Sequence, residues 1–238
     1  MCIRDRFIAR HLYNFFVEDE VQVPSWETIP PKNPEAVEEL TTAYMESQGN
    51  IGVVLKTLFS SQFFREAANK PKVKSPAELI VGVLRQTGEF SQPKPGIHEF
   101  AVTTLNGSPF EGPLAIMGQR LMNPPTVEGW HTGRDWIDGG TLVRRINFVA
   151  DYVGDAGYPG IQDIVQRLAA EGPTTTPEGL VEGCLRLLGH YELTDENHQM
   201  LVNHARNGDF FATDSPEFPK QVGEILQMIV ATKEYLYA

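Results

Sequence analysis

The sequence has little cysteine, fewer basic than acidic residues, and no long apolar run. It holds two cysteines, and its 20 lysines and arginines are outnumbered by 31 aspartates and glutamates, which gives a net charge of −11. This acidic balance argues against nucleic-acid binding, because neutralising a phosphate backbone needs a basic surface. No stretch approaches the roughly 18 to 20 consecutive apolar residues of a transmembrane helix. We therefore expect no nucleic-acid partner and no membrane span in these 238 residues.

The sequence motifs of common catalytic sites are also missing. There is no G-x-S-x-G or S-x-x-K nucleophile motif, no Walker phosphate loop and no Rossmann glycine set. Cys184 lies among apolar residues at helical spacing, where a small core side chain is the simplest interpretation. The motifs thus predict neither a cofactor nor a catalytic nucleophile.

Most of the chain has the three- and four-residue apolar spacing of helices, and strand-like alternation of useful length is absent. The spacing predicts an all-α fold, an irregular multi-helix bundle of about nine helices with one long loop rich in tryptophan and glycine. Residues with capping chemistry mark several helix starts. They are Asn33 before Pro34, Asn50, the capping box Ser75-Pro76-Ala77-Glu78, and Thr176 before Pro177.

In the first helix, the apolar residues Ile8, Leu12, Phe15 and Phe16 share one face, which we expect to be buried. Residues 21–34 contain four prolines and predict an extended connector. Short helices are expected around residues 98–105 and 114–121.

The ends of the chain and its charge distribution bear on domain organisation. Residues 1–6, MCIRDR, resemble a translated sequencing-adapter remnant, so we expect the native segment to begin near Phe7 as a fragment of a longer protein. Residues 7–238 then form a single all-α domain fragment. The acidic excess falls mainly in residues 151–238, which leaves open two lobes, 7–150 and 151–238, or simply a solvated helical face.

Three stretches resemble the bacterial family called domain of unknown function 1800 (DUF1800). They are RHLYNFFV (10–17), VLKTLFSSQFF with VKSPAELIVGVLRQTG (54–88), and MGQRLMNPPTVEGWHTGRDWI (117–137), and the final IVATKEYLYA resembles the usual ending of the family. The resemblance implies a mostly helical fold, a missing N-terminal half, and frequent export to the periplasm or exterior. It also implies genes that neighbour a second exported family. It supplies no activity and no catalytic residues.

The densest group of chemically capable side chains lies in the loop of residues 129–136, GWHTGRDW. Trp130 and Trp136 could stack on a sugar or another ring, with Arg134 and Asp135 hydrogen-bonding it. Alternatively, His131 could act as a general base that Asp135 orients. A purely structural interpretation has both tryptophans plugging the loop onto the helical core, with Arg134 and Asp135 capping helix ends.

Other polar clusters favour structural roles. His190, His198 and His204 are separated by eight and six residues, which does not place two ligands on one helical turn, so we predict no metal site. His204 lies on an apolar stripe and is expected to be a core histidine. The run of Lys70, Lys72 and Lys74 favours a solvated loop over a phosphate site.

The leading hypothesis is therefore a binding or assembly module of an exported bacterial protein, without catalysis of its own. Its partner would be a glycan or a co-encoded exported protein, recognised through the loop that contains Trp130 and Trp136. The alternative is a hydrolase acting on a polysaccharide or cell-surface polymer, with His131 and Asp135 as acid and base. The sequence leaves the oligomeric state open.

Overall fold

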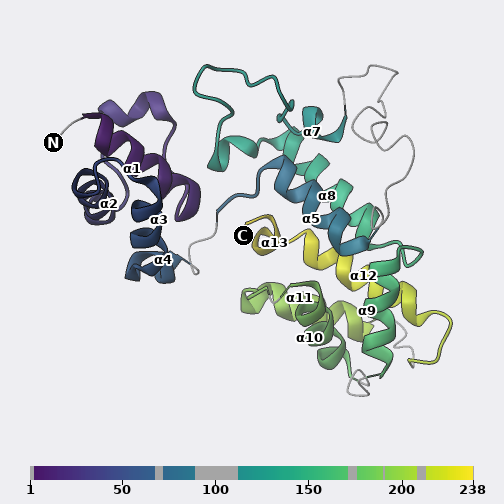
Figure 1. Ribbon diagram of the computed structural model, residues 1–238. Helices are drawn as coiled ribbons and strands as arrows, with labels where there is room; N and C mark the ends of the chain where they lie inside the picture. Colours follow the sequence, from purple (N-terminus) through teal and green to yellow (C-terminus); the bar gives the residue numbers. More distant parts are fainter. Residues whose placement is uncertain are drawn as a thin grey trace. The chain divides into compact units, whose positions relative to one another are not determined.

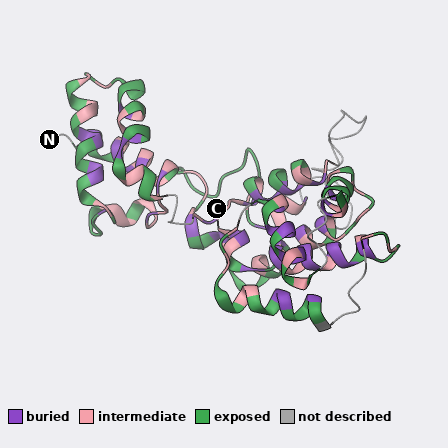
Figure 2. Cartoon of the chain, turned by 90° about the horizontal axis from the view of Figure 1, so that it is seen from below, coloured by how far each residue is buried: buried purple, intermediate pink, exposed green. Residues whose placement is uncertain are grey.

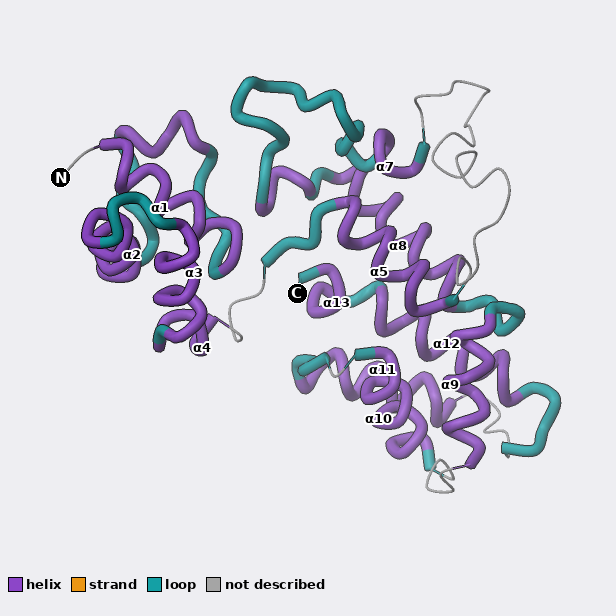
Figure 3. Tube along the Cα trace, viewed as in Figure 1, coloured by secondary structure: helices purple, strands orange, loops and turns teal. Residues whose placement is uncertain are grey.

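The computed structural model describes residues 3–67, 72–88, 112–170, 176–189, 191–207 and 213–237. Over these ranges it contains 12 α-helices, nine of them with seven or more residues, and no strand (Figures 1 and 3). The all-α prediction is therefore confirmed. The short helix expected at 98–105 falls outside the described residues. No described helix is long and apolar enough to cross a membrane.

The contacts divide the chain into two compact units. Unit 1 contains the described residues up to Val73 together with Pro125–Asp135, and unit 2 contains those of Lys74–Pro124 and Trp136–Tyr237. Two lobes divided at residue 150 stay a prediction from the charge distribution.

Unit 1 is a small helical body with its own core. Its elements are α1 (Ile3–Phe16), the 3₁₀ turn η1 (Val23–Glu27), α2 (Pro34–Glu46), α3 (Ile51–Ser60) and α4 (Gln62–Ala67). Helix α1 packs against α2 and α3, and its Ala9 and Tyr13 meet Leu40 and Leu58 in the core. The predicted caps are confirmed, since the side chains of Asn33 and Asn50 accept the N–H groups of Ala36 and Val53.

The buried face of α1 differs from the predicted one. Its buried residues are Asp5, Ala9, Arg10 and Tyr13, whereas Phe15 is 71% exposed. Leu12 and Phe16 are partly buried and pack against this core, so the prediction was wrong for Phe15 and missed the polar residues. Apolar spacing ignores polar side chains whose ends find partners inside the protein. Tyr13 does so by donating its hydroxyl to Glu18 at 3.1 Å.

Unit 2 is built around α12 (Phe218–Val230), which packs against α8 (Gly139–Val153), α9 (Pro159–Ala170), α10 (Pro177–Leu188) and α11 (Asp195–Asn207). Its Val222, Ile225, Leu226 and Ile229 have no exposed surface. Figure 2 shows how the buried residues concentrate along the inward sides of the helices. The other elements are α5 (Pro76–Thr87), α7 (Pro113–Ile116), η2 (Gly133–Trp136, shared with the end of unit 1) and α13 (Lys233–Leu236).

The helix starts in unit 2 follow local chemistry. Ser75 and Glu78 form the predicted capping box of α5, and Thr176 caps α10. Asp138 is a further cap that was not predicted: its carboxylate accepts the N–H groups of Gly140 and Thr141 at the start of α8. The helix expected at 114–121 is only the single turn α7. Cys184 is fully buried in α10, as predicted, and burial raises the pKa of its thiol to about 12.

Candidate functional site

The connector between α1 and α2 is held by an ion pair inside unit 1. Arg10 of α1 meets Glu20 at 2.7 Å, and the two side chains are only 5% and 1% exposed. The same guanidinium donates to the carbonyl of Ile29 at 2.9 Å and lies over the Trp26 ring at 4.6 Å. Arg10 thereby fastens the far end of the connector to α1.

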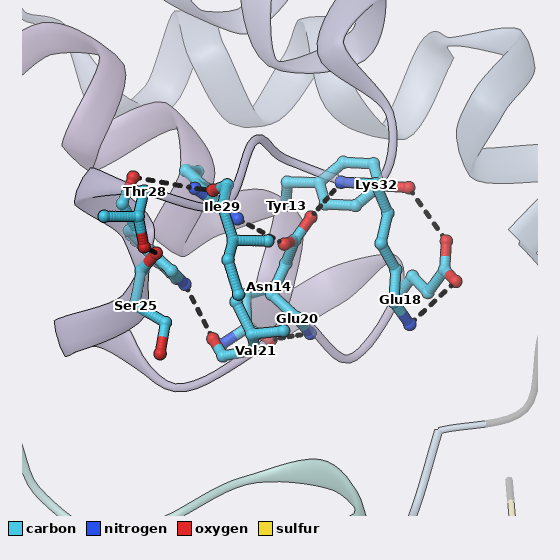
Figure 4. Close-up of polar contacts among 11 residues, drawn as sticks. Tyr13, Asn14, Glu18, Glu20, Val21, Ser25, Thr28, Ile29 and Lys32 are labelled. Atoms are coloured by element: carbon cyan, nitrogen blue, oxygen red, sulfur yellow. Dashed lines mark hydrogen bonds and ion pairs between the residues drawn. The ribbon is translucent and has the colours of Figure 1, made fainter.

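Glu20 and Trp26 complete this network (Figure 4). The second carboxylate oxygen of Glu20 accepts the backbone N–H of Lys32 at 2.9 Å. The backbone N–H of Glu20 donates to the side-chain oxygen of Asn14. The Trp26 indole N–H donates to the carbonyl of Val21 at 2.6 Å. Residues 21–34, predicted to be extended, therefore enclose the 3₁₀ turn η1 and are fixed at both ends.

The tryptophan loop is attached to this connector. The Gln22 side chain donates to the carbonyl of Thr132 at 3.0 Å. Gly133 has φ +63° and is buried against Asp19, whose Cβ would lie 3.1 Å from any Cβ added to the glycine. A side chain at Gly133 is excluded both by this contact and by the left-handed backbone.

Together, α1, the connector and the loop enclose a pocket of about 400 Å³, which we call the loop pocket. It is lined by His11, Leu12, Asn14, Phe15, Val21, Gln22, Val23, Pro24, Thr126, Glu128, Trp130, His131 and Thr132. All of these residues belong to unit 1. The lining combines aromatic rings with amide, hydroxyl, imidazole and carboxylate groups, as small-molecule sites commonly do.

Trp130 and His11 give this pocket its chemistry. The Trp130 indole nitrogen is buried and has no hydrogen-bond partner among the described residues, although a buried indole N–H normally finds an acceptor. His11 packs its ring against Phe7 and Trp26, and burial lowers the pKa of its imidazole. At neutral pH the His11 ring therefore offers one hydrogen-bond donor and one acceptor without a charge.

His131 and Asp135 do meet, at 3.3 Å between Nδ1 and Oδ2. Both side chains are about half exposed, at 47% and 50%. His131 lines the loop pocket, and Asp135 is not among its lining residues. Arg134 is exposed, and it too lies outside the lining.

Trp136 belongs to unit 2, whereas Trp130 belongs to unit 1. It is 6% exposed, its ring lies beside Gly118, and its carbonyl accepts the Thr141 hydroxyl at 3.1 Å. This placement corresponds to the structural interpretation of Trp136. The structure therefore brings Trp130 and His131 together in one pocket, whereas Trp136 belongs to the core of unit 2.

The histidines of α11 pair with glutamates. His198 meets Glu182 at 2.8 Å, and His204 meets Glu224 at 3.6 Å. The prediction of a core His204 was wrong: its side chain is 47% exposed, because the buried face of α11 is formed by Leu201, Val202 and Ala205. No three His, Cys, Asp or Glu side chains converge on a metal position in the part of the chain that is described, and His190 lies outside that part.

Lys72 and Lys74 were predicted to lie in a solvated loop, but both ammonium groups donate hydrogen bonds to main-chain carbonyls. Lys72 donates to the carbonyls of Asn14 and Phe15 at the end of α1, at 2.6 and 2.7 Å. Lys74 is partly buried in unit 2, and Lys70 lies outside the described residues. The prediction failed because main-chain carbonyls at helix ends bind ammonium groups without leaving any motif in the sequence.

His11, Asn14 and Phe15 of α1 line the pocket but were not predicted to do so. In the sequence they are only polar and aromatic residues within an amphipathic helix, and such a pattern is too common to predict a site. Glu128 also lines the pocket and was not predicted, because it lies one residue before the segment 129–136.

A model of one protein family matches residues 4–237, which is nearly the whole chain, and its description is "Protein of unknown function (DUF1800)". This match confirms the resemblance seen in the sequence. No curated protein and no solved structure matches the chain.

Proposed function

The chain belongs to the DUF1800 family, and from this premise we propose that it is a binding module that recognises a sugar ring of a glycan in the loop pocket. The observation that supports this most strongly is the convergence of Trp130 and His131 with His11 and Phe15 around one cavity. We further propose that the protein acts outside the cytoplasm of a bacterium, as part of an exported assembly.

The lining matches the chemistry of a sugar. A pyranose presents an apolar face, which packs on aromatic rings, and a rim of hydroxyl groups, which need donors and acceptors. Phe15 and Trp130 supply the aromatic surface, and Asn14, Gln22 and Glu128 supply polar atoms. A sugar hydroxyl that entered the pocket could accept the Trp130 indole N–H, which has no described partner.

The pocket wall is also held in place before a ligand arrives. Val21 and Gln22 are fixed by the Trp26 and Thr132 hydrogen bonds, and Glu20 by its ion pair. A preformed wall reduces the entropy lost on binding, which favours recognition.

Calorimetric titration with soluble cello-, chito- and manno-oligosaccharides tests this proposal. At least one series should bind the wild type, and Trp130→Ala should abolish binding without changing the helical circular dichroism. Arg134→Ala is the matched control, because Arg134 is exposed and outside the pocket lining. Binding that Trp130→Ala leaves intact would contradict a site in the loop pocket.

A hydrolase remains the second candidate, favoured by the 3.3 Å contact of His131 with Asp135. Hydrolysis of a glycosidic bond usually needs two carboxyl groups that flank it. Glu128 is the one acid among the residues that line the loop pocket, which supports binding over catalysis. Release of new reducing ends from the same oligosaccharides, lost in Asp135→Asn, would favour the hydrolase.

A co-encoded exported protein is the other partner that we propose for the assembly. Co-purification with that protein tests this idea separately from glycan binding. Retention of the partner by Trp130→Ala would show that the two surfaces are distinct.

A further inference from the structure

Unit 2 contains two neighbouring cations, Arg145 and Lys74. Arg145 of α8 has no exposed surface. Its Nη2 donates to the main-chain carbonyl of Lys74, while its Nε and Nη1 have no hydrogen-bond partner among the described residues. A buried guanidinium normally pairs with an anion or satisfies its N–H groups in full, because leaving it unpaired is costly.

Lys74 is the second cation. Its ammonium group donates to the carbonyl of Tyr235 at 2.6 Å and to the hydroxyl of Tyr191 at 3.4 Å. It also lies over both tyrosine rings, 4.3 Å from the centre of Tyr235 and 5.1 Å from that of Tyr191. Burial and the nearby Arg145 charge lower the pKa of Lys74 to about 8.

Glu78, whose charge acts on both cations, already has a hydrogen-bonding role. Its carboxylate accepts the backbone N–H of Ser75 at 2.7 Å as part of the capping box of α5. Among the described residues, neither Lys74 nor Arg145 forms an ion pair with a carboxylate. Glu78 therefore reduces the positive potential of this pair of cations but does not neutralise it.

We infer that Lys74 and Arg145 form a binding site for a phosphate group, either inorganic phosphate or the phosphate of a monoester. The Nε–H and Nη1–H groups of the Arg145 guanidinium, unpartnered among the described residues, can each donate a charge-assisted hydrogen bond to an anion oxygen, and an ammonium adds a mobile point charge. Two cations suit a group that carries nearly two negative charges at neutral pH. Lys74 is the partly exposed member, so the anion approaches from its side and reaches the free N–H groups of Arg145 beyond it.

Tyr191 and Tyr235 frame the site. The Tyr235 hydroxyl donates to the Gln86 side chain at 3.3 Å, which fixes the ring over which Lys74 lies. The Tyr191 hydroxyl accepts from Lys74 and keeps its own proton available for a phosphate oxygen. The site is independent of the loop pocket, since all of its residues lie in unit 2.

Thermal unfolding of the full chain, with phosphate compared against chloride at equal ionic strength, tests this inference. At a phosphate concentration about tenfold above Kd, the expected rise in Tm over chloride is about 3 to 6 °C. Titration calorimetry with inorganic phosphate and with glycerol phosphate measures the affinity for the free ion and for a monoester directly. Tighter binding of the monoester would identify an esterified ligand, and tighter binding of inorganic phosphate would identify the free ion.

Three variants distinguish a ligand site from a structural role. Arg145→Met and Lys74→Met should weaken phosphate binding by about 10- to 100-fold, the loss expected for a charge-assisted hydrogen bond. Arg144→Met, at the exposed neighbouring position of α8, should bind phosphate like the wild type. Should Arg145→Met not fold, Lys74→Met decides. A wild type that responds equally to phosphate and chloride, or a Lys74→Met protein that binds phosphate unchanged, would overturn the inference.

Discussion

Arg10 and Glu20 form an ion pair of 2.7 Å that is almost wholly removed from solvent, and it joins α1 to the connector that walls the loop pocket. A buried pair of this kind contributes little net stability, yet breaking it leaves one charge uncompensated. We therefore regard the pair as the element that fixes the path of the connector.

Removing one partner should destabilise unit 1 strongly. Glu20→Gln should lower the free energy of unfolding by about 3 to 5 kcal/mol, because the buried Arg10 charge loses its counter-charge. Urea unfolding followed by tryptophan fluorescence measures this, since Trp26 lies against Arg10. Lys32→Met is the control, because the Lys32–Glu18 pair is more exposed and should change stability by at most about 1 kcal/mol. Equal effects of the two substitutions would contradict the assigned role of Glu20.

The stability of unit 2 should depend on the protonation of Lys74. The folded pKa of about 8 lies below the usual value of 10.5, so the unfolded chain binds more protons between these pH values. The free energy of unfolding should therefore rise with pH across that window, and Lys74→Met should reduce the rise. Denaturation in phosphate-free buffer between about pH 7.5 and 9.5 checks this, below the range in which unfolded tyrosines ionise. A slope that Lys74→Met leaves unchanged would show that another group is responsible.

Cys184 should be inert in the folded protein. Its thiol is buried in α10 and its pKa is raised to about 12, so little thiolate forms at neutral pH. Iodoacetamide should modify Cys184 only after denaturation, as measured by mass spectrometry of the peptide that contains it. Rapid modification of that peptide in the native state would place the α10 thiol at the surface.

The two loop tryptophans should respond differently to truncation. Trp136→Ala should lower the free energy of unfolding by about 3 to 5 kcal/mol, because its ring is buried in unit 2. Trp130→Ala should cost less stability, since that ring is partly exposed. Thermal unfolding of the two variants side by side checks this order, and a reversed order would show that Trp130 is the core residue.

Helix starts were predictable from sequence because they depend on residues three or four positions apart. The Asn33, Asn50, Ser75 and Thr176 caps are satisfied within their own turns, so local chemistry specifies them. Asp138 was missed because the glycines that follow it do not look like the start of a helix, although its cap bonds are equally local.

The buried polar groups could not be predicted in the same way. Arg10 and Tyr13 occupy the inner face of α1 only because Glu20 and Glu18 reach them from the connector. Lys74 and Arg145 are 71 positions apart, and their contact depends on how α5 and α8 pack. Such pairings arise from tertiary structure, so apolar spacing assigns these residues to the surface.

The candidate site was predictable only in part. The density of side chains in residues 129–136 drew attention to Trp130 and His131, which line one pocket, but sequence proximity also grouped them with Trp136, which belongs to unit 2. The chain enters unit 2 at Trp136, so residues adjacent in sequence belong to different cores. The α1 side of the pocket lies more than a hundred positions away and leaves no local signal.

The most direct test of the loop pocket follows the indole N–H signals of Trp26, Trp130 and Trp136 by two-dimensional ¹H–¹⁵N NMR during titration with the best-binding oligosaccharide. The Trp130 signal should shift progressively to saturation, because its N–H has no described partner until a ligand enters. The Trp136 signal should stay in place, since that ring is buried in unit 2. A titration that shifts Trp136 and leaves Trp130 unmoved would contradict the account.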